Sequence, residues 1–569
     1  MKTTLIALTL GTTSIALLSG CANSPGGHPP APRKAQGAAL QSCASLATGF
    51  HAPDTVIDSA EPVKAGEMTL AKQPVAAHCL VKGRMHSRQG SDGHTYAIGF
   101  EMRLPDAWNG RFYYQANGGL DGSVKPAEGA LGGGPLTGAL LQGFAVISSD
   151  AGHNEKQTVT FGAEPQARLD YGYQAVAKLT PMAKALIAQA YGKAPDHSYI
   201  GGCSNGGRHA MVAASRLTDA YDGYLVGAPG YQLPLAALAQ IRSTQLWAPL
   251  ATPGATVQHP MVPQFKIADL GTAFNATERK TFSQALLAKC DALDGAKDGL
   301  VQDVQACQAI FKIDTDVATC AGQRDGTCLT AEQKSVLSQV FGGVKTPKGQ
   351  QIYSAFPLDA GVAADNWALW KFVFSMALDP LSTGVVFSSP PGKVNPLKDD
   401  TDARLALFRI TNGPYKESAL ALMTPPGHER PTYMRHLAQR GGKMIAYHGV
   451  SDPIFSAEDT RAWVERVRDT PGAEDAVRYF PVPGMNHCRD GLATDQFDLL
   501  TPLVKWVEEG VAPQAVTASA RGAGNPGGEN KELPPGWSPD RTRPLCAYPT
   551  VATYNGKGDL ERASSFHCQ

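Results

Sequence analysis

The sequence predicts an α/β fold in which a mostly parallel sheet is interrupted by a long inserted block. Residues 90–230 and 440–510 both alternate short apolar strands with helices. The block between them, residues 231–427, breaks this alternation with Pro, Gly and pairs of cysteines. In addition, a strand near residue 200 runs into a tight Gly-rich turn and then a helix. Together these features predict one α/β domain split by an inserted lid.

Each element follows from its own hydrophobic pattern. Tyr96–Leu104 alternates apolar and polar residues, as in an antiparallel strand, whereas Gly110–Gln115 and Phe144–Ser148 are apolar enough for core strands. Arg168–Tyr191 is expected to form a long helix. After the block, the pattern predicts a strand at 442–449, a helix at 457–468, a strand at 476–482 and a helix at 499–510.

The turn near residue 200 carries the first candidate catalytic residue. Gly202-Cys203-Ser204-Asn205-Gly206 fits Gly-x-Ser-x-Gly, the nucleophile elbow. The pattern alone occurs by chance in long chains, but here a short apolar strand at 196–201 precedes it and a helix at 208–217 follows it. This context predicts Ser204 as a nucleophile, with the N–H groups of the helix N-terminus directed at a developing oxyanion.

Two downstream residues complete a possible triad. Asp452 comes just after the strand at 442–449, and His487 lies on a Gly/Asn loop. Alone, Asp452 could be a turn former before Pro453. However, the order Ser, Asp, His is that of α/β-hydrolases. The sequence therefore predicts an α/β-hydrolase fold with a large inserted lid domain and the triad Ser204, Asp452 and His487.

The cysteines reinforce this interpretation, because Cys203 and Cys488 each adjoin a candidate catalytic residue. The chain has 11 cysteines, and an even set of ten remains without Cys21. Such a set in an exported chain argues for disulfides, although sequence alone does not fix the connectivity. Spacing suggests the pairs Cys290–Cys307, Cys320–Cys328, Cys546–Cys568 and Cys43–Cys79, which leaves Cys203–Cys488.

The N-terminus predicts export. A basic start and a short apolar run end in Leu18-Ser19-Gly20-Cys21, similar to a bacterial lipobox in which Cys21 would be lipidated. The alternative is an ordinary signal peptidase site. We expect residues 1–21 to be the signal segment, 22–38 a flexible tether, 39–230 and 428–569 the catalytic domain, and 231–427 the lid. The protein is expected in the periplasm, on the outer membrane or secreted, with a possible lipid anchor at Cys21 as its only membrane attachment.

Composition excludes several classes of function. Basic and acidic residues balance at 51 each, so nothing indicates nucleic-acid binding. A zinc or dinucleotide enzyme lacks its usual motifs, His-Glu-x-x-His and a strand-borne Gly-x-Gly-x-x-Gly. The remaining rival is a binding protein on a degenerate hydrolase scaffold, which the intact candidate triad disfavours.

Two Gly-rich loops are further candidate sites. The stretch 115–122 follows an early strand and could furnish one oxyanion N–H, with Asn205 furnishing the other, although it could also be a plain turn. In Asp291–Leu300, three carboxylates and two glycines suit an oxygen-ligated cation, most simply calcium. The alternative is a solvated acidic turn.

Together these motifs resemble the tannase/feruloyl esterase family of serine hydrolases, from about Ala39 to Cys568. The resemblance rests on Cys203-Ser204, Asp452, His487-Cys488, the Asp291–Leu300 loop and Ala228-Pro229-Gly230-Tyr231. It implies the five disulfide pairs above and a small aromatic ester as substrate. It also implies site residues: oxyanion donors Gly119 and Asn205, pocket residues Trp370 and Phe455, and structural calcium held by side chains of Asp291, Asp294 and Asp298 and carbonyls of Ala296 and Leu300.

Within the family, the chain is similar to the bacterial mono(2-hydroxyethyl) terephthalate hydrolases, with one departure. Their lid carries an arginine that clamps the substrate carboxylate, whereas Lys371–Pro391 contains no Arg. Only a lysine such as Lys371, or a residue elsewhere in the lid, could then pair with that carboxylate, and a lysine does not reproduce a bidentate Arg fork. We therefore expect an esterase for phenolic acid esters such as ferulates. The alternative is hydrolysis of the terephthalate monoester to terephthalate and ethylene glycol.

Overall fold

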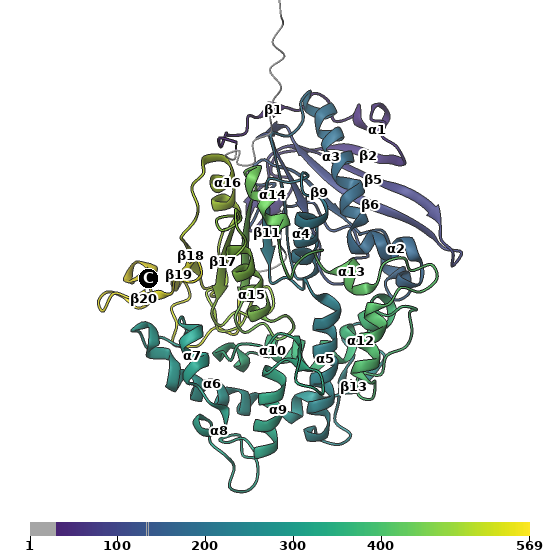
Figure 1. Cartoon of the computed structure of the whole chain (residues 1–569). Helices are drawn as coiled ribbons and strands as arrows, with labels where there is room; N and C mark the ends of the chain where they lie inside the picture. Colours follow the sequence, from purple (N-terminus) through teal and green to yellow (C-terminus); the bar gives the residue numbers. More distant parts are fainter. Residues whose placement is uncertain (1–29, 132–133, 135) are drawn as a thin grey trace, which may run out of the picture.

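The computed structural model describes residues 30–131, 134 and 136–569 (Figure 1). The expected signal segment and Cys21 lie outside these residues. At the centre is a nine-stranded sheet in the order β17-β16-β11-β10-β8-β9-β6-β5-β2. The strands are β2 (Thr55–Val63), β5 (His78–Gln89), β6 (Thr95–Pro105), β8 (Arg111–Gln115), β9 (Ala145–Ser149), β10 (His197–Cys203), β11 (Gly223–Gly227), β16 (Lys443–Gly449) and β17 (Val477–Val482).

The six strands from β9 to β17 pair in parallel, and β6, β5 and β2 extend the sheet antiparallel at the other edge. This confirms the predicted α/β-hydrolase architecture. The sequence patterns locate β6, β8, β9, β10, β16 and β17 to within a few residues. They miss β2, β5 and β11; the last is only five residues long and is bounded by glycines at both ends.

Helices cover the parallel strands because each presents an apolar side to the sheet. They include α3 (Ala175–Tyr191), α4 (Asn205–Arg216), α15 (Ala457–Arg468) and α16 (Leu500–Glu509). The long helix expected over 168–191 is present but not uniform. It starts as α2 (Pro165–Leu169) and passes through a π-helical turn at Asp170–Gln174 before α3. Such turns often occur at functional sites, and Tyr171 within it contacts the candidate site described below.

The chain between β11 and β16 contributes no strand to the described nine-stranded sheet. It holds two short hairpins and a set of helices, most of which lie below the sheet in the view of Figure 1. The last of these helices, α14 (Tyr433–Gln439), lies higher, beside α4. The principal helices are α5 (Leu233–Trp247), α6 (Ala276–Cys290), α7 (Val304–Ile310), α9 (Ala331–Phe341), α10 (Asp365–Ala368), α11 (Ser375–Ser382), α12 (Thr401–Arg409), α13 (Ala419–Met423) and α14 (Tyr433–Gln439). A cluster of buried aromatic rings lies in the core of this segment, where Phe274 stacks on Trp247 and meets Trp367 edge-on.

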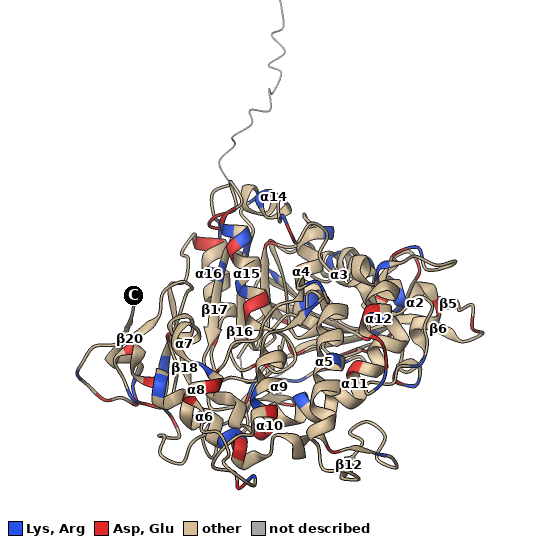
Figure 2. Cartoon of the chain, turned by 60° about the horizontal axis from the view of Figure 1, so that its bottom comes forward, with Lys and Arg blue, Asp and Glu red and all other residues tan. Residues whose placement is uncertain are grey.

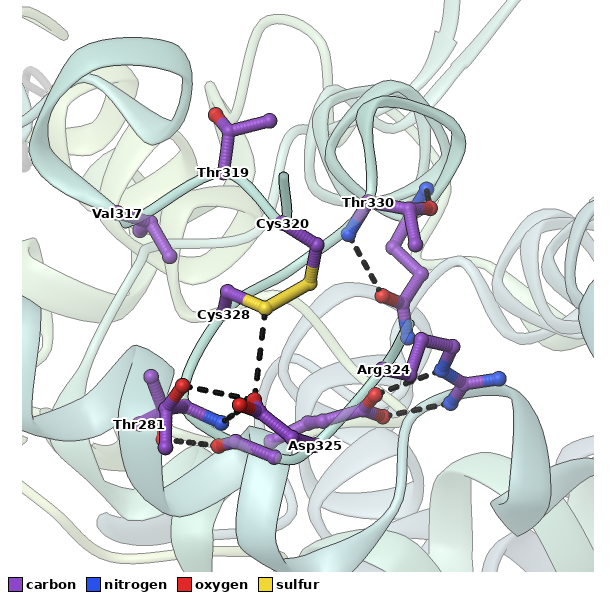
Figure 3. Close-up of a disulfide and its surroundings, with 12 residues drawn as sticks. Thr281, Val317, Thr319, Cys320, Arg324, Asp325, Cys328 and Thr330 are labelled. Carbon is purple, nitrogen blue, oxygen red and sulfur yellow. Dashed lines mark hydrogen bonds and ion pairs between the residues drawn. A yellow bond between two sulfur atoms is a disulfide. The ribbon is translucent and has the colours of Figure 1, made fainter. Parts of the chain in front are cut away.

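Five disulfides join the ten cysteines in the pairs that spacing and the family resemblance implied. One of them, Cys320–Cys328, closes a short surface loop of the inserted segment (Figure 3). Within the same loop, Arg324 forms an ion pair with Glu278 of α6 at 2.7 Å, and the Thr281 hydroxyl donates to the carbonyl of Gly326. The disulfide and these contacts fasten the loop to α6.

No helix among the described residues is long and apolar enough to cross a membrane. Basic and acidic residues are interspersed along the chain in the view of Figure 2, in keeping with their equal numbers.

Candidate active site

Ser204 sits in the sharp turn between β10 and α4. Its backbone has φ 67° and ψ −127°, a conformation that L-residues rarely adopt. Glycines make the turn possible, since a Cβ at Gly202 or Gly206 would overlap the carbonyl oxygen of Ala116. The Ser204 N–H donates to the carbonyl of Gly227 at 3.0 Å, which fixes the turn against β11. The local structure is therefore that of a nucleophile elbow.

The structure brings Ser204, His487 and Asp452 into one hydrogen-bonded chain. Asp452 Oδ2 lies 2.7 Å from His487 Nδ1, and His487 Nε2 lies 2.9 Å from Ser204 Oγ. Because a carboxylate only accepts, Nδ1 carries the ring proton and Nε2 accepts from the serine hydroxyl. This arrangement can remove the serine proton during nucleophilic attack and return it to a leaving alcohol.

Asp452 is fully buried, and its two oxygens accept several hydrogen bonds. Oδ1 accepts from the N–H groups of Ile454 and Phe455 at 2.9 and 3.0 Å. Burial alone would raise the pKa of Asp452, but the charge of His487 and hydrogen bonds from His448 and His487 hold that pKa well below its usual range. Asp452 therefore stays ionised and can stabilise the imidazolium that forms in the reaction.

The two expected oxyanion donors lie on either side of the elbow. Asn205 is the first residue of α4, so its N–H has no carbonyl partner within the helix. Gly119 lies on the loop after β8 with φ 63°. The neighbouring Gly118 packs on the elbow so closely that a Cβ there would be 3.8 Å from Ser204 Cβ. The Gly119 loop and the start of α4 thus border the same space beside Ser204.

A set of buried hydrogen bonds, the oxyanion network, links the two donor segments. The Tyr171 hydroxyl donates to the Gly119 carbonyl at 3.1 Å, and Arg208 Nη2 donates to the Tyr171 carbonyl at 3.1 Å. Arg208 Nε donates to Asn205 Oδ1 at 2.7 Å, and Asn205 Nδ2 donates to Asp121 Oδ2 at 3.0 Å. The Asn205 side chain, which the sequence analysis did not use, therefore helps to hold its own backbone against the Gly119 loop.

The Cys203–Cys488 disulfide joins the residue before Ser204 to the residue after His487, with 6.1 Å between the Cα atoms. Cys488 has φ 65°, so the chain turns sharply as it leaves the histidine. The bridge is the shortest covalent connection between the loops that carry the candidate nucleophile and base.

Aromatic side chains flank the histidine. The ring centroids of Trp370 and Phe455 lie 4.7 and 5.2 Å from that of His487, both edge-on. Trp370 also packs on Phe374 at 4.6 Å. Trp370 and Phe455, which the family resemblance implies as pocket residues, both lie beside His487.

Lys371, named above as a possible partner for a substrate carboxylate, is used differently. Its side chain is buried, its Nζ lies 3.0 Å from Gln240 Oε1, and it lies over the Phe356 ring. Burial lowers its pKa to about 7. Gln240 in turn donates to the carbonyls of Pro453 and Ile454 at 3.2 and 3.0 Å. Lys371 therefore supports the loop after Asp452, because its amine is already bound within the inserted segment.

The Asp291–Leu300 loop is compact, and its three carboxylates mostly accept backbone N–H groups of the loop itself. Within residues 30–131, 134 and 136–569, no cluster of three or more His, Cys, Asp or Glu side chains has metal-binding geometry. Asp298 is paired with Arg543, whereas Asp294 Oδ2 is buried without a partner. Burial and the nearby charges of Asp298 and Asp291 raise the pKa of Asp294 to about 7. A cation would satisfy that oxygen.

Fold and site define an α/β-hydrolase of the carboxylic ester hydrolase class. The model of one family, "Tannase and feruloyl esterase", matches residues 79–569, so the chain belongs to this family. It is 36% identical over 554 residues to the mono(2-hydroxyethyl) terephthalate hydrolase of Piscinibacter sakaiensis, covering 90% of this chain and 88% of that protein.

More distant relatives include two feruloyl esterases, one matched by sequence and one by structure. Feruloyl esterase C of Talaromyces stipitatus is 25% identical over 561 residues, with 92% of this chain and 94% of that protein covered. The crystal structure of feruloyl esterase B from Aspergillus oryzae superposes with a TM-score of 0.71 at 23% identity, covering 93% of this chain and 99% of that chain. At that identity, the structural likeness speaks for the fold alone.

Proposed function

We propose that the protein is a serine carboxylesterase that hydrolyses aromatic, chiefly phenolic, acid esters through an acyl-enzyme. Ser204 attacks the ester carbonyl, His487 takes the serine proton and gives it to the leaving alcohol, and Asp452 holds the imidazole. The N–H groups of Gly119 and Asn205 stabilise the oxyanion. Water then hydrolyses the acyl-enzyme. The observation that carries this proposal is the chain of short contacts from Asp452 through His487 to Ser204.

The aromatic part of the proposal rests on Trp370 and Phe455, whose rings flank His487 and would pack against an aromatic acyl group. Trp370→Ala should lower kcat/KM for methyl ferulate by about tenfold or more, while p-nitrophenyl acetate, whose acyl group is small, is affected much less. Trp370→Phe is the matched control and should retain most activity on both esters. Equal losses on both esters in Trp370→Ala would contradict an acyl-binding role.

A second candidate function is hydrolysis of mono(2-hydroxyethyl) terephthalate, favoured by the 36% identity to an enzyme of that name. Against it, Lys371–Pro391 contains no Arg, and Lys371 is engaged with Gln240. A substrate carboxylate without a partner would be costly to bury. Dimethyl terephthalate and monomethyl terephthalate form a matched pair in which the far end of the ring carries a neutral methyl ester in one and a charged carboxylate in the other. We expect the neutral diester to have the higher kcat/KM; preference for the monoester would put this second function first.

We also propose a structural calcium ion in the Asp291–Leu300 loop. The side chains of Asp291, Asp294 and Asp298 and the carbonyls of Ala296 and Leu300 would hold it, as the family resemblance implies. The unpartnered buried oxygen of Asp294 supports this. The ion would brace the inserted segment and take no part in the chemistry.

Finally, we propose that the protein acts outside the cytoplasm. Five disulfides favour an oxidising compartment. The lipobox-like sequence at Cys21 would add a lipid anchor. Mass spectrometry of the mature N-terminal peptide tests this: a diacylated Cys21 is expected, and an unmodified N-terminus elsewhere would contradict the anchor.

A further inference from the structure

A second histidine contacts the carboxylate of the proposed triad. His448 is near the end of β16, four residues before Asp452, and both side chains are fully buried. His448 Nε2 lies 3.2 Å from Asp452 Oδ2 and 3.1 Å from the carbonyl oxygen of Phe455. Both of these oxygens can only accept while Asp452 is ionised. His448 Nε2 therefore carries a proton that it shares between them.

The other nitrogen of His448 has its own partner, which selects this tautomer. His448 Nδ1 lies 2.8 Å from the Thr460 hydroxyl on α15. In a neutral imidazole with its proton on Nε2, Nδ1 accepts, so the Thr460 hydroxyl donates to it. The Thr460 hydroxyl thus keeps the N–H of His448 directed at the carboxylate of Asp452.

Asp452 Oδ2 consequently serves two imidazole rings, His487 at 2.7 Å and His448 at 3.2 Å. Each N–H that bonds an ionised carboxylate takes up part of its negative charge. With the His448 N–H bonded to it, Asp452 Oδ2 attracts a proton on His487 less strongly than it would without His448. Removing the His448 donor would leave His487 easier to protonate, and only the unprotonated ring can act as general base.

We propose that His448 is a positioning residue that orients Asp452 and lowers the pH at which His487 becomes competent as general base. This inference rests on the proposed function. Among the described residues, Lys371 from the inserted segment and Tyr353 also interact electrostatically with Asp452. They have hydrogen-bond partners of their own, Gln240 Oε1 and the Ser456 N–H. Two buried carboxylates lie close by: Asp359 accepts from the hydroxyl of Ser451, the residue before Asp452, and Asp459 precedes Thr460, the partner of His448. His448 and His487 are therefore the ionisable side chains that hydrogen-bond the carboxylate.

The test is kcat/KM for p-nitrophenyl acetate against pH in the full chain. His448→Met fills the buried space without a donor, and His448→Gln keeps an amide N–H of similar reach. In His448→Met, we expect the acidic limb of the profile to move up by about one pH unit, equivalent to about a tenfold change in proton affinity. The plateau should also fall by about tenfold. His448→Gln should restore most of the wild-type limb.

An unmoved limb in folded His448→Met, whatever the loss in plateau activity, would overturn the inference. If neither His448 variant folds, Thr460→Val, which lacks the hydroxyl, and Thr460→Ser, which keeps it, make the same comparison. The limb should move only in Thr460→Val, and identical limbs in both would overturn the inference. Ser204→Ala in the same assay separates this result from the proposed function. Near-wild-type activity of Ser204→Ala would refute the triad itself. If Ser204→Ala is inactive and the acidic limb of His448→Met is unmoved, only the role of His448 is refuted.

Discussion

The Cys203–Cys488 bridge offers the sharpest test of how the site is held together. We consider the double variant Cys203→Ala/Cys488→Ala. The bridge spans 285 residues of sequence, and the chain-entropy relation for a loop of that size gives a contribution of about 5.6 kcal/mol to the free energy of unfolding. The bridge also joins the residues next in sequence to Ser204 and His487. The Oγ atom of Ser204 and the Nε2 atom of His487 lie 2.9 Å apart and must stay at that distance for proton transfer.

We therefore expect two effects of different kind. Stability should fall by several kcal/mol, and kcat at a temperature where the variant is fully folded should fall by about a hundredfold, the cost of a small misplacement of reacting groups. Urea unfolding measures the first effect, and turnover of methyl ferulate at 25 °C measures the second. Burst titration with p-nitrophenyl acetate would give the fraction of competent enzyme.

The matched control is Cys320→Ala/Cys328→Ala, which opens a surface loop with a separation of 8 residues. It should lower the free energy of unfolding by about 2–3 kcal/mol and leave kcat unchanged. If the Cys203/Cys488 variant also keeps wild-type kcat while losing stability, the bridge contributes stability alone and its positioning role is wrong.

Three further outcomes follow from particular contacts. EDTA should lower the melting temperature without changing kcat at 25 °C, because an ion bound only to the folded state stabilises it; an unchanged melting curve and no calcium in metal analysis would contradict the calcium proposal. Tyr171→Phe removes the hydroxyl that holds the Gly119 carbonyl and should lower kcat about fivefold with little change in KM, whereas Tyr221→Phe, which also removes a buried hydroxyl, should not. Hydrogen bonds and the charge of Arg111 lower the pKa of Glu508 despite its burial. The ionised carboxylate therefore stabilises the folded state at every pH above its unfolded pKa of about 4.3. This stabilisation is lost as the pH falls through the lower pKa of the folded state. The stability deficit of Glu508→Gln should accordingly be large at pH 7 and shrink below pH 4 or so; a deficit independent of pH would contradict this.

The sequence located the parallel strands that carry the site because their apolar runs are buried on both faces and end in recognisable turns. Ser204, Asp452 and His487 could be placed at such turns and in the expected order, and the structure brings them together. Strands β2 and β5 lie at the half-exposed edge of the sheet, carry many charged and polar residues, and were not predicted. In β2, a bulge between Ile57 and Ser59 also breaks the alternation of its side chains.

Other parts of the site depend on tertiary contacts that local patterns do not encode. Tyr171 comes from a π-helical turn inside a segment that reads as an ordinary helix, and nothing local indicates that its hydroxyl reaches Gly119. Asn205 and Arg208 are three residues apart on α4, a spacing that could have suggested their contact. Lys371 shows that a residue next to a site residue in sequence can lie away from the site. Because it follows Trp370, it was expected to be available to a substrate. However, successive residues of a helix point in different directions, and its amine is buried against Gln240.

Every catalytic role proposed here depends on Ser204 as the nucleophile of an acyl-enzyme esterase, and the turnover of Ser204→Ala measures that role. The variant removes one oxygen atom and leaves Asp452, His487, both oxyanion N–H groups and the disulfide in place. With methyl ferulate as substrate and circular dichroism to show an unchanged fold, we expect kcat to fall by a factor on the order of 10⁶. A folded Ser204→Ala enzyme that retains turnover within about tenfold of wild type would show that Ser204 is not the nucleophile.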